Sequence, residues 1–393
     1  MPELECIAAH RGGQFSWPLL RMVQKQWRWP GLLAVLLLLI SSSLAGQEPP
    51  QEPRLFLEKQ LAFSHDQLLQ VAHGAVVAKI LKPRKHEVAA VAVVRVNVPQ
   101  EFFLARFRDI EQFKKGPTVP LVNKFSDPVR LDDLRDMVLL PQEVNDLKNC
   151  RPGQCTFKLS DQQIQLIHQQ VDWEAADAAE QTVAAVRRIL ADYVRSYAAE
   201  GNKAMLSYHD KQVALNTVDQ FHELVEGSSF LLDYAPDFRD YLYSFPDAAL
   251  PSAENFIYWS RENYGHTLKP VITITHVTID RRPNGSKPAV LIASKQIYGS
   301  HYFEASLGLT VLFRAMPSDP TPSFYLVYLS RTRIDLLRKW YSGLARGRLS
   351  ETVRSSMRAN MFETKTRLEA EYKASQAPAA PPARFHDRKR RQR

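Results

Sequence analysis

The sequence lacks the motifs of the common enzyme classes. Its 393 residues contain no Gly-x-Ser-x-Gly, no His-Glu-x-x-His, no P-loop and no Gly-x-Gly-x-x-Gly. These absences remove the usual hydrolase, metalloprotease and nucleotide-binding interpretations, although an enzyme of another kind stays open. The sequence accordingly predicts no cofactor, no metal site and no catalytic residue. It also has no internal repeat.

The main part of the chain has little net charge. Hydrophobic residues make up 45% and charged residues 24%, which excludes wholesale disorder, collagen and a multispanning membrane protein. The formal net charge is +9, but residues 1–46 carry +2 and residues 376–393 carry +5, which leaves +2 for all the rest. A nearly neutral body argues against nucleic acid as a partner. The length allows two or three domains.

The chain has one long apolar run, GLLAVLLLLI at residues 31–40. Its ten residues are fewer than the roughly 20 that cross a bilayer, but they fit the core of a secretory signal peptide. Lys25 and Arg28 supply the positive flank, and Ser43 and Ala45 form a small-x-small cleavage site. The run therefore predicts export through the secretory pathway, to the periplasm or the extracellular space.

Residues 1–46 are thus expected to be a leader and signal peptide. We expect Met22 to be the true initiator, because a start there gives a signal peptide of normal length and order. Cleavage would place the mature N-terminus near Gln47. An uncleaved segment that anchors the protein in the membrane is the alternative.

Cysteine is scarce, and its spacing predicts one disulfide. Cys6 lies in the leader, which leaves Cys150 and Cys155 in the sequence Cys-Arg-Pro-Gly-Gln-Cys. Pro152-Gly153 is a favoured centre of a type II turn, so the two sulfurs are expected to face each other across a tight hairpin. An oxidising compartment then favours a disulfide. Half of a zinc site is the alternative, but no second Cys or His pair has zinc-ligand spacing.

Hydrophobic periodicity predicts an α+β fold. Alternating valines and alanines in 87–98 indicate a strand, Ser160 and Gln163 form a helix capping box, and Asn284-Gly285 indicates a hairpin between strands at 271–280 and 288–298. We expect an antiparallel sheet covered by a long C-terminal helix of about 25 residues, with a helical block inserted. The expected segments are an N-terminal linker and helix at 47–74, the first part of the sheet domain at 75–159, the helical block at 160–265, the second part of the sheet domain with the C-terminal helix at 266–375, and a tail at 376–393.

This order of elements resembles the helix-grip fold of START-like lipid-binding domains. The shared order, over residues 75–125 and 270–373, is a strand or two followed at once by a helix, later antiparallel strands, then a long amphipathic helix. The resemblance implies a last helix packed across a curved sheet, over an apolar cavity that holds a sterol, lipid or other apolar molecule. The helical block departs from the family pattern, which has strands there. The chain is also similar to secreted bacterial proteins of unassigned function.

The second predicted hairpin offers a candidate ligand site. His276 shares a strand face with Ile272 and Ile274, and Lys295 shares one with Leu291 and Ile297. A few polar groups among apolar neighbours can orient a ligand in a pocket. The candidate ligand-binding residues are His276, Lys295, Tyr298, His301 and Tyr302. The alternative is structural, with His276 hydrogen-bonded in the core and Lys295 reaching water along its alkyl stem.

The C-terminal residues 376–393 combine an Ala/Pro linker with a basic run, and we expect them to be a disordered tail. An anionic membrane surface is a possible partner through Arg384, Arg388, Lys389, Arg390, Arg391 and Arg393. A merely solubilising tail is the alternative.

Together these features predict an exported, periplasmic or membrane-associated protein that binds an apolar or lipid-like ligand between its sheet and C-terminal helix. The alternatives are a periplasmic enzyme using His276, Lys295 and His301, or a structural or interaction protein without a small-molecule site.

Overall fold

The computed structural model describes residues 50–265, 268–282, 288–315, 321–338 and 342–377. These residues belong to one compact unit. The expected signal peptide, the Asn284-Gly285 turn and residues 378–393 of the expected tail lie outside them, so the structure does not address the predictions made for those residues. None of the described helices is long and apolar enough to cross a membrane.

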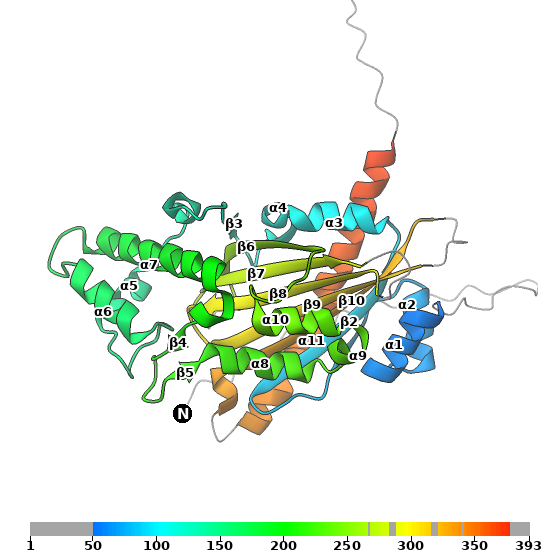
Figure 1. Cartoon of the computed structure of the whole chain (residues 1–393), viewed down its shortest axis with the longest axis horizontal. Helices are drawn as coiled ribbons and strands as arrows, with labels where there is room; N and C mark the ends of the chain where they lie inside the picture. Colours follow the sequence, from blue (N-terminus) through cyan, green and yellow to red (C-terminus); the bar gives the residue numbers. More distant parts are fainter. Residues whose placement is uncertain (1–49, 266–267, 283–287, 316–320, 339–341, 378–393) are drawn as a thin grey trace, which may run out of the picture. The chain divides into compact units, whose positions relative to one another are not determined.

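One eight-stranded antiparallel sheet forms the centre of the fold (Figure 1). Its spatial order is β1-β2-β10-β9-β8-β7-β6-β3, which places the first and last long strands side by side. The strands are β1 (Val77–Ile80), β2 (Glu87–Val96), β3 (Leu121–Lys124), β6 (Ala253–Glu262), β7 (Val271–Arg281), β8 (Val290–Gly299), β9 (Phe303–Arg314) and β10 (Phe324–Ile334). A separate two-stranded ladder joins β4 (Ser207–Tyr208) to β5 (Leu215–Asn216).

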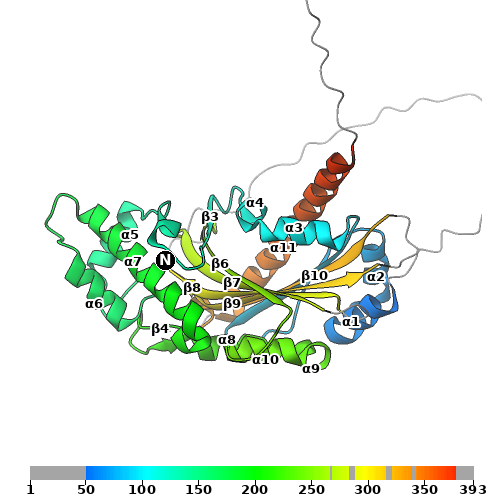
Figure 2. The ribbon, with the colours of Figure 1, turned by 45° about the horizontal axis from the view of Figure 1, so that its top comes forward.

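Helices cover both faces of the sheet. Figure 2 shows α8 (Thr217–Gly227), α9 (Phe230–Tyr234) and α10 (Pro236–Ser244) on one face and α3 and α11 on the other. On the α11 face lie α3 (Gln100–Arg108), α4 (Ile110–Lys114) and α11 (Ser342–Gln376). Met357, Met361 and Leu368 of α11 pack into the core on this side, and α11 lies against β1 and β2. The predicted covering of the sheet by the C-terminal helix is therefore confirmed.

The remaining helices are the N-terminal pair and those of the insertion, of which α8, α9 and α10 lie on the opposite face of the sheet (Figure 2). These are α1 (Gln51–Leu61), α2 (His65–Ala72), α5 (Pro141–Lys148), α6 (Asp161–Gln170), α7 (Ala178–Glu200), α8 (Thr217–Gly227), α9 (Phe230–Tyr234) and α10 (Pro236–Ser244), with short 3-10 helices at Leu131–Leu134, Gly201–Ala204 and Asp335–Arg338. Phe56 of α1 contacts Phe230 of α9 and Phe313 of β9, with ring centroids 5.3 and 5.1 Å apart. These aromatic contacts fix α1 against both the helices and the sheet.

Several boundaries differ from the sequence prediction. Residues 253–262, assigned to the helical block, form strand β6, because Phe256, Tyr258 and Trp259 pack on the two faces of the sheet. The C-terminal helix spans 35 residues rather than about 25. By contrast, the antiparallel sheet and the disulfide are confirmed, since Cys150 and Cys155 are bonded with their Cα atoms 4.5 Å apart.

The element order behind the resemblance is present in the structure. Strand β2 is followed at once by α3 and α4, and strands β6 to β10 precede α11. The insertion between β3 and β6 carries helices α5 to α10. Of these inserted helices, α8, α9 and α10 lie on the face of the sheet that α11 does not cover, whereas α5, α6 and most of α7 extend past the end of the strands (Figure 2).

Candidate functional site

His276 and Lys295 lie directly opposite each other on neighbouring strands. They are paired in the register of β7 and β8, and both side chains point into the core beneath the inserted helices. His276 is 4% exposed and Lys295 is 2% exposed. The sequence prediction that the hairpin brings these two residues together is confirmed.

The imidazole of His276 is held on both sides by neutral partners. Its Nδ1 atom lies 3.0 Å from the Tyr197 hydroxyl, and its Nε2 atom lies 2.9 Å from Oδ1 of Asn255. This pairing fits a neutral ring whose proton sits on Nε2 and whose Nδ1 accepts from Tyr197. Burial, and then the charge of Lys295, lowers the pKa of His276 to about 3.

The amine of Lys295 is enclosed by side chains of the inserted block. It donates a hydrogen bond to Oδ1 of Asn202 and lies 4.1 Å from the centre of the Phe221 ring and 5.2 Å from that of Tyr197. Burial lowers the pKa of this amine well below its ordinary value. Together with His276, Lys295 therefore ties helices α7 and α8 to the sheet.

The other predicted ligand-binding residues have different neighbours. Tyr298 packs against Tyr208, and its hydroxyl bonds to no atom of the described chain. Nδ1 of His301 lies 2.7 Å from the carbonyl oxygen of Thr156, and burial lowers the pKa of this histidine. The hydroxyl of Tyr302 accepts from the backbone N–H of Lys269. The five residues thus do not converge on one point, and their role in ligand binding stays a prediction.

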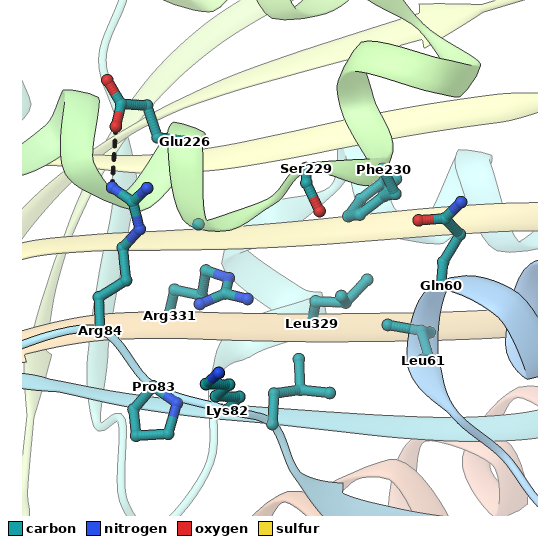
Figure 3. A pocket seen from close by; sticks show the side chains of 12 residues that line it. Gln60, Leu61, Lys82, Pro83, Arg84, Glu226, Ser229, Phe230, Leu329 and Arg331 are labelled. Atoms are coloured by element: carbon teal, nitrogen blue, oxygen red, sulfur yellow. Dashed lines mark hydrogen bonds and ion pairs between the residues drawn. The ribbon is translucent and has the colours of Figure 1, made fainter.

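A pocket of about 380 Å³ lies elsewhere, where the inserted helices meet β10. Its walls are the end of α1, the connection from β1 to β2, the turn from α8 to α9, and β10 (Figure 3). The lining residues are Gln60, Leu61, Leu81, Lys82, Pro83, Arg84, Glu226, Gly227, Ser229, Phe230, Leu329 and Arg331. A volume of this size is within the range of small-molecule sites.

Arg331 forms the polar floor of this pocket. The residue is 8% exposed, and its Nη1 atom lies 2.5 Å from Oε1 of the fully buried Glu87. The other carboxylate oxygen of Glu87 accepts from the backbone N–H of Arg84 at 2.9 Å. Nε of Arg331 is buried and has no hydrogen-bond partner within the described residues. A buried N–H without a partner is uncommon in folded proteins, so this atom marks a place for an acceptor.

A glycine leaves the space that Arg331 occupies. A Cβ atom at Gly227 would lie 2.9 Å from Nη1 and 3.2 Å from Cζ of Arg331. Any larger residue would therefore push the guanidinium away from its position. The end of α8 thus has to lack a side chain for the floor of the pocket to form.

The mouth of the pocket carries an ion-pair cluster. Nη1 of Arg84 lies 2.9 Å from Glu223 and 2.8 Å from Glu226, both on α8. The hydrogen bond with Glu226, more than that with Glu223, raises the pKa of Arg84. Lys82, also at the mouth, is exposed and forms no ion pair with the part of the chain that the structure describes. The connection from β1 to β2 is therefore fastened to α8 across the opening (Figure 3).

The remaining wall is apolar. Leu329 precedes Arg331 by two residues on the same face of β10, and Leu61, Leu81 and Phe230 continue this surface. This pocket was not predicted from the sequence. The sequence does contain one indication of it. Leu329 and Arg331 alternate with more exposed residues of β10 and so lie on its buried face, where an arginine needs a buried partner.

A second pocket, of about 420 Å³, lies beside the disulfide hairpin and is lined by Arg151, Pro152, Ile164, Gln165, His168 and Gln169. Nε2 of His168 lies 2.8 Å from the carbonyl oxygen of Cys150 and 2.9 Å from Nη1 of Arg151, so the polar side chains of this pocket are already bonded to the hairpin.

Among the described residues no group of three His, Cys, Asp or Glu side chains could hold a metal ion.

Comparisons with protein-family models, with curated proteins and with solved structures gave no match for this chain.

Proposed function

We propose that this is an exported protein that binds a small lipid-like molecule in the pocket above Arg331. The ligand class is the one expected from the sequence, and the pocket lies on the face of the sheet opposite to α11. One observation carries the proposal: a pocket of about 380 Å³ joins an apolar wall to a buried polar atom that lacks a partner. Half of the twelve lining residues are apolar and half are polar, so the pocket offers both a surface that a hydrocarbon group can cover and polar groups that can orient a ligand.

The arrangement favours binding over catalysis. The carboxylates around the pocket that could transfer protons are already engaged, since Glu87 and Glu226 are both paired with arginines. The apolar side chains of Leu61, Leu329 and Phe230 supply the surface that a hydrocarbon ligand would bury. The cavity expected between the sheet and α11, and an enzymatic role of His276, Lys295 and His301, stay predictions.

The proposal is tested with the neutral fluorescent probe N-phenylnaphthylamine. We expect its emission to rise on binding to the mature protein and to be lost in Ser229→Trp. Ser229 is exposed and lines the pocket, so an indole at this position would fill the space without disturbing the core. Ser375→Trp, at an exposed position near the end of α11, is the matched control and should bind as the parent does. Equal binding by parent, Ser229→Trp and Ser375→Trp would contradict the proposal.

A further inference from the structure

We infer that the ligand carries a carboxylate, and that Arg331 binds it. This inference rests on the proposed function and names the chemical class of ligand for the same pocket. It starts from the one guanidinium in the pocket floor, which is buried, fixed on one side and unpartnered at Nε.

Glu87 fixes the orientation of the guanidinium and leaves one edge unused. Its two carboxylate oxygens are occupied by Nη1 of Arg331 and by the backbone N–H of Arg84. The carboxylate is fully buried, so water does not compete for it. Arg331 is therefore held in one place before any ligand arrives, which reduces the entropy lost on binding.

Lys82 is the lining cation that pairs with no carboxylate of the described residues, because Glu87 pairs with Arg331, and Glu223 and Glu226 pair with Arg84. Lys82, Arg84 and Arg331 are cationic, and Glu226 is the single acidic side chain in the lining. Arg84 is engaged by Glu223 and Glu226, so the groups left to meet a ligand are the ammonium of Lys82 at the mouth and the guanidinium of Arg331, which lines the floor. A hydrogen bond from a cationic donor to a carboxylate is stronger than one to a neutral oxygen.

The position of the apolar wall defines the rest of the ligand. Leu329 lies next to Arg331 on the same face of β10, and Leu61 and Phe230 continue from it (Figure 3). A carboxylate at Arg331 therefore leaves an attached alkyl or aryl group over Leu329, between α1 and α9. A ligand with one carboxylate and an attached hydrocarbon group matches this arrangement, in which the polar floor at Arg331 is followed by the apolar wall.

The test compares ligands that share one hydrocarbon chain. Octanoate, octanol, octylamine and octyl phosphate are titrated calorimetrically into the mature protein. We expect octanoate to bind about tenfold or more tightly than octanol, because a charged hydrogen bond replaces a neutral one. Octylamine should bind more weakly than either. Octanol equal to octanoate, or octyl phosphate tenfold tighter than octanoate, would overturn the carboxylate assignment.

Variants of the pocket floor separate the head group from the pocket itself. In Arg331→Met combined with Glu87→Gln, no unpaired charge remains buried, and we expect octanoate and octanol to bind equally while N-phenylnaphthylamine still binds. Arg333→Met is the matched control: Arg333 lies on the same strand face but outside the pocket lining, where it bonds to Gln220. It should keep the preference for octanoate.

The two proposals fail in different ways. If the neutral probe binds but octanoate has no advantage over octanol, the carboxylate inference is wrong and the proposed function stands. If neither the probe nor any octyl ligand binds, the proposed function is wrong and the inference falls with it. If the double variant keeps the full preference for octanoate, the assignment to Arg331 is wrong.

Discussion

Acidification should destabilise the protein through His276. The folded-state pKa of this histidine is about 3, against an ordinary value of 6.5. Between these values the unfolded chain binds a proton that the folded protein does not, so the free energy of unfolding falls as the pH falls. A difference of roughly 3.5 units corresponds to about 5 kcal/mol, an upper limit reached near pH 3. The physical cause is that Tyr197 and Asn255 satisfy the neutral ring, whereas a buried imidazolium would lie near Lys295.

The measurement uses His276→Gln, which cannot gain a charge. Urea unfolding is followed by tryptophan fluorescence from pH 7 down to pH 4 for the parent and the variant, and the difference in free energy of unfolding is plotted against pH. Carboxylates titrate in both proteins and cancel in this difference. At pH 7 the variant should be the less stable, and its deficit should shrink by about 1.4 kcal/mol per pH unit below 6.5.

His73→Gln, at an exposed position after α2, controls for the loss of an imidazole at the surface. A parent-minus-variant difference for His276→Gln that stays constant from pH 7 to pH 4 would refute the reasoning. It would mean that His276 is protonated in the folded protein, or that the site opens to water without unfolding.

The remaining predictions concern the disulfide and the two ends of the chain. Replacing Cys150 and Cys155 together by serine should lower the free energy of unfolding by about 2 kcal/mol, since the closed loop is very short; denaturant titration checks this, and complete unfolding of the variant would contradict it. After export from a bacterial host, N-terminal sequencing should find a start within a few residues of Gln47, whereas a retained Met22 would show an uncleaved anchor. Deletion of residues 376–393 should abolish salt-sensitive binding to anionic vesicles, measured by co-sedimentation, and unchanged binding would show that the tail is not responsible.

The fold was largely predictable because its strongest signals are local. The alternation in β2 and β7 and the capping box at Ser160 each depend on residues within a few positions of one another. Strand β6 was missed because Phe256, Ile257, Tyr258 and Trp259 are consecutive and apolar, which hides the two-residue period. Both of its faces are covered, so both kinds of position are apolar.

The candidate site was less predictable because its partners are far apart in the chain. Arg331 is paired with Glu87, 244 residues earlier, and no local pattern relates the two. The juxtaposition of His276 and Lys295 was predictable, since both lie on one hairpin. That Tyr197, Asn202 and Phe221 enclose these two side chains could not be predicted, because those residues come from the inserted helices, far away in the sequence.

The separation of the pocket walls along the chain also links ligand binding to folding. Residues 60–61, 81–84, 226–230 and 329–331 meet only in the native state, so the unfolded chain has no equivalent site. A ligand that binds only the native state adds about 2.7 kcal/mol of stability at a hundredfold excess over its dissociation constant. If the proposed function holds, protein as purified from its host should therefore melt at a higher temperature than the same protein after organic extraction, and a melting curve would report occupancy of the pocket before the ligand is identified.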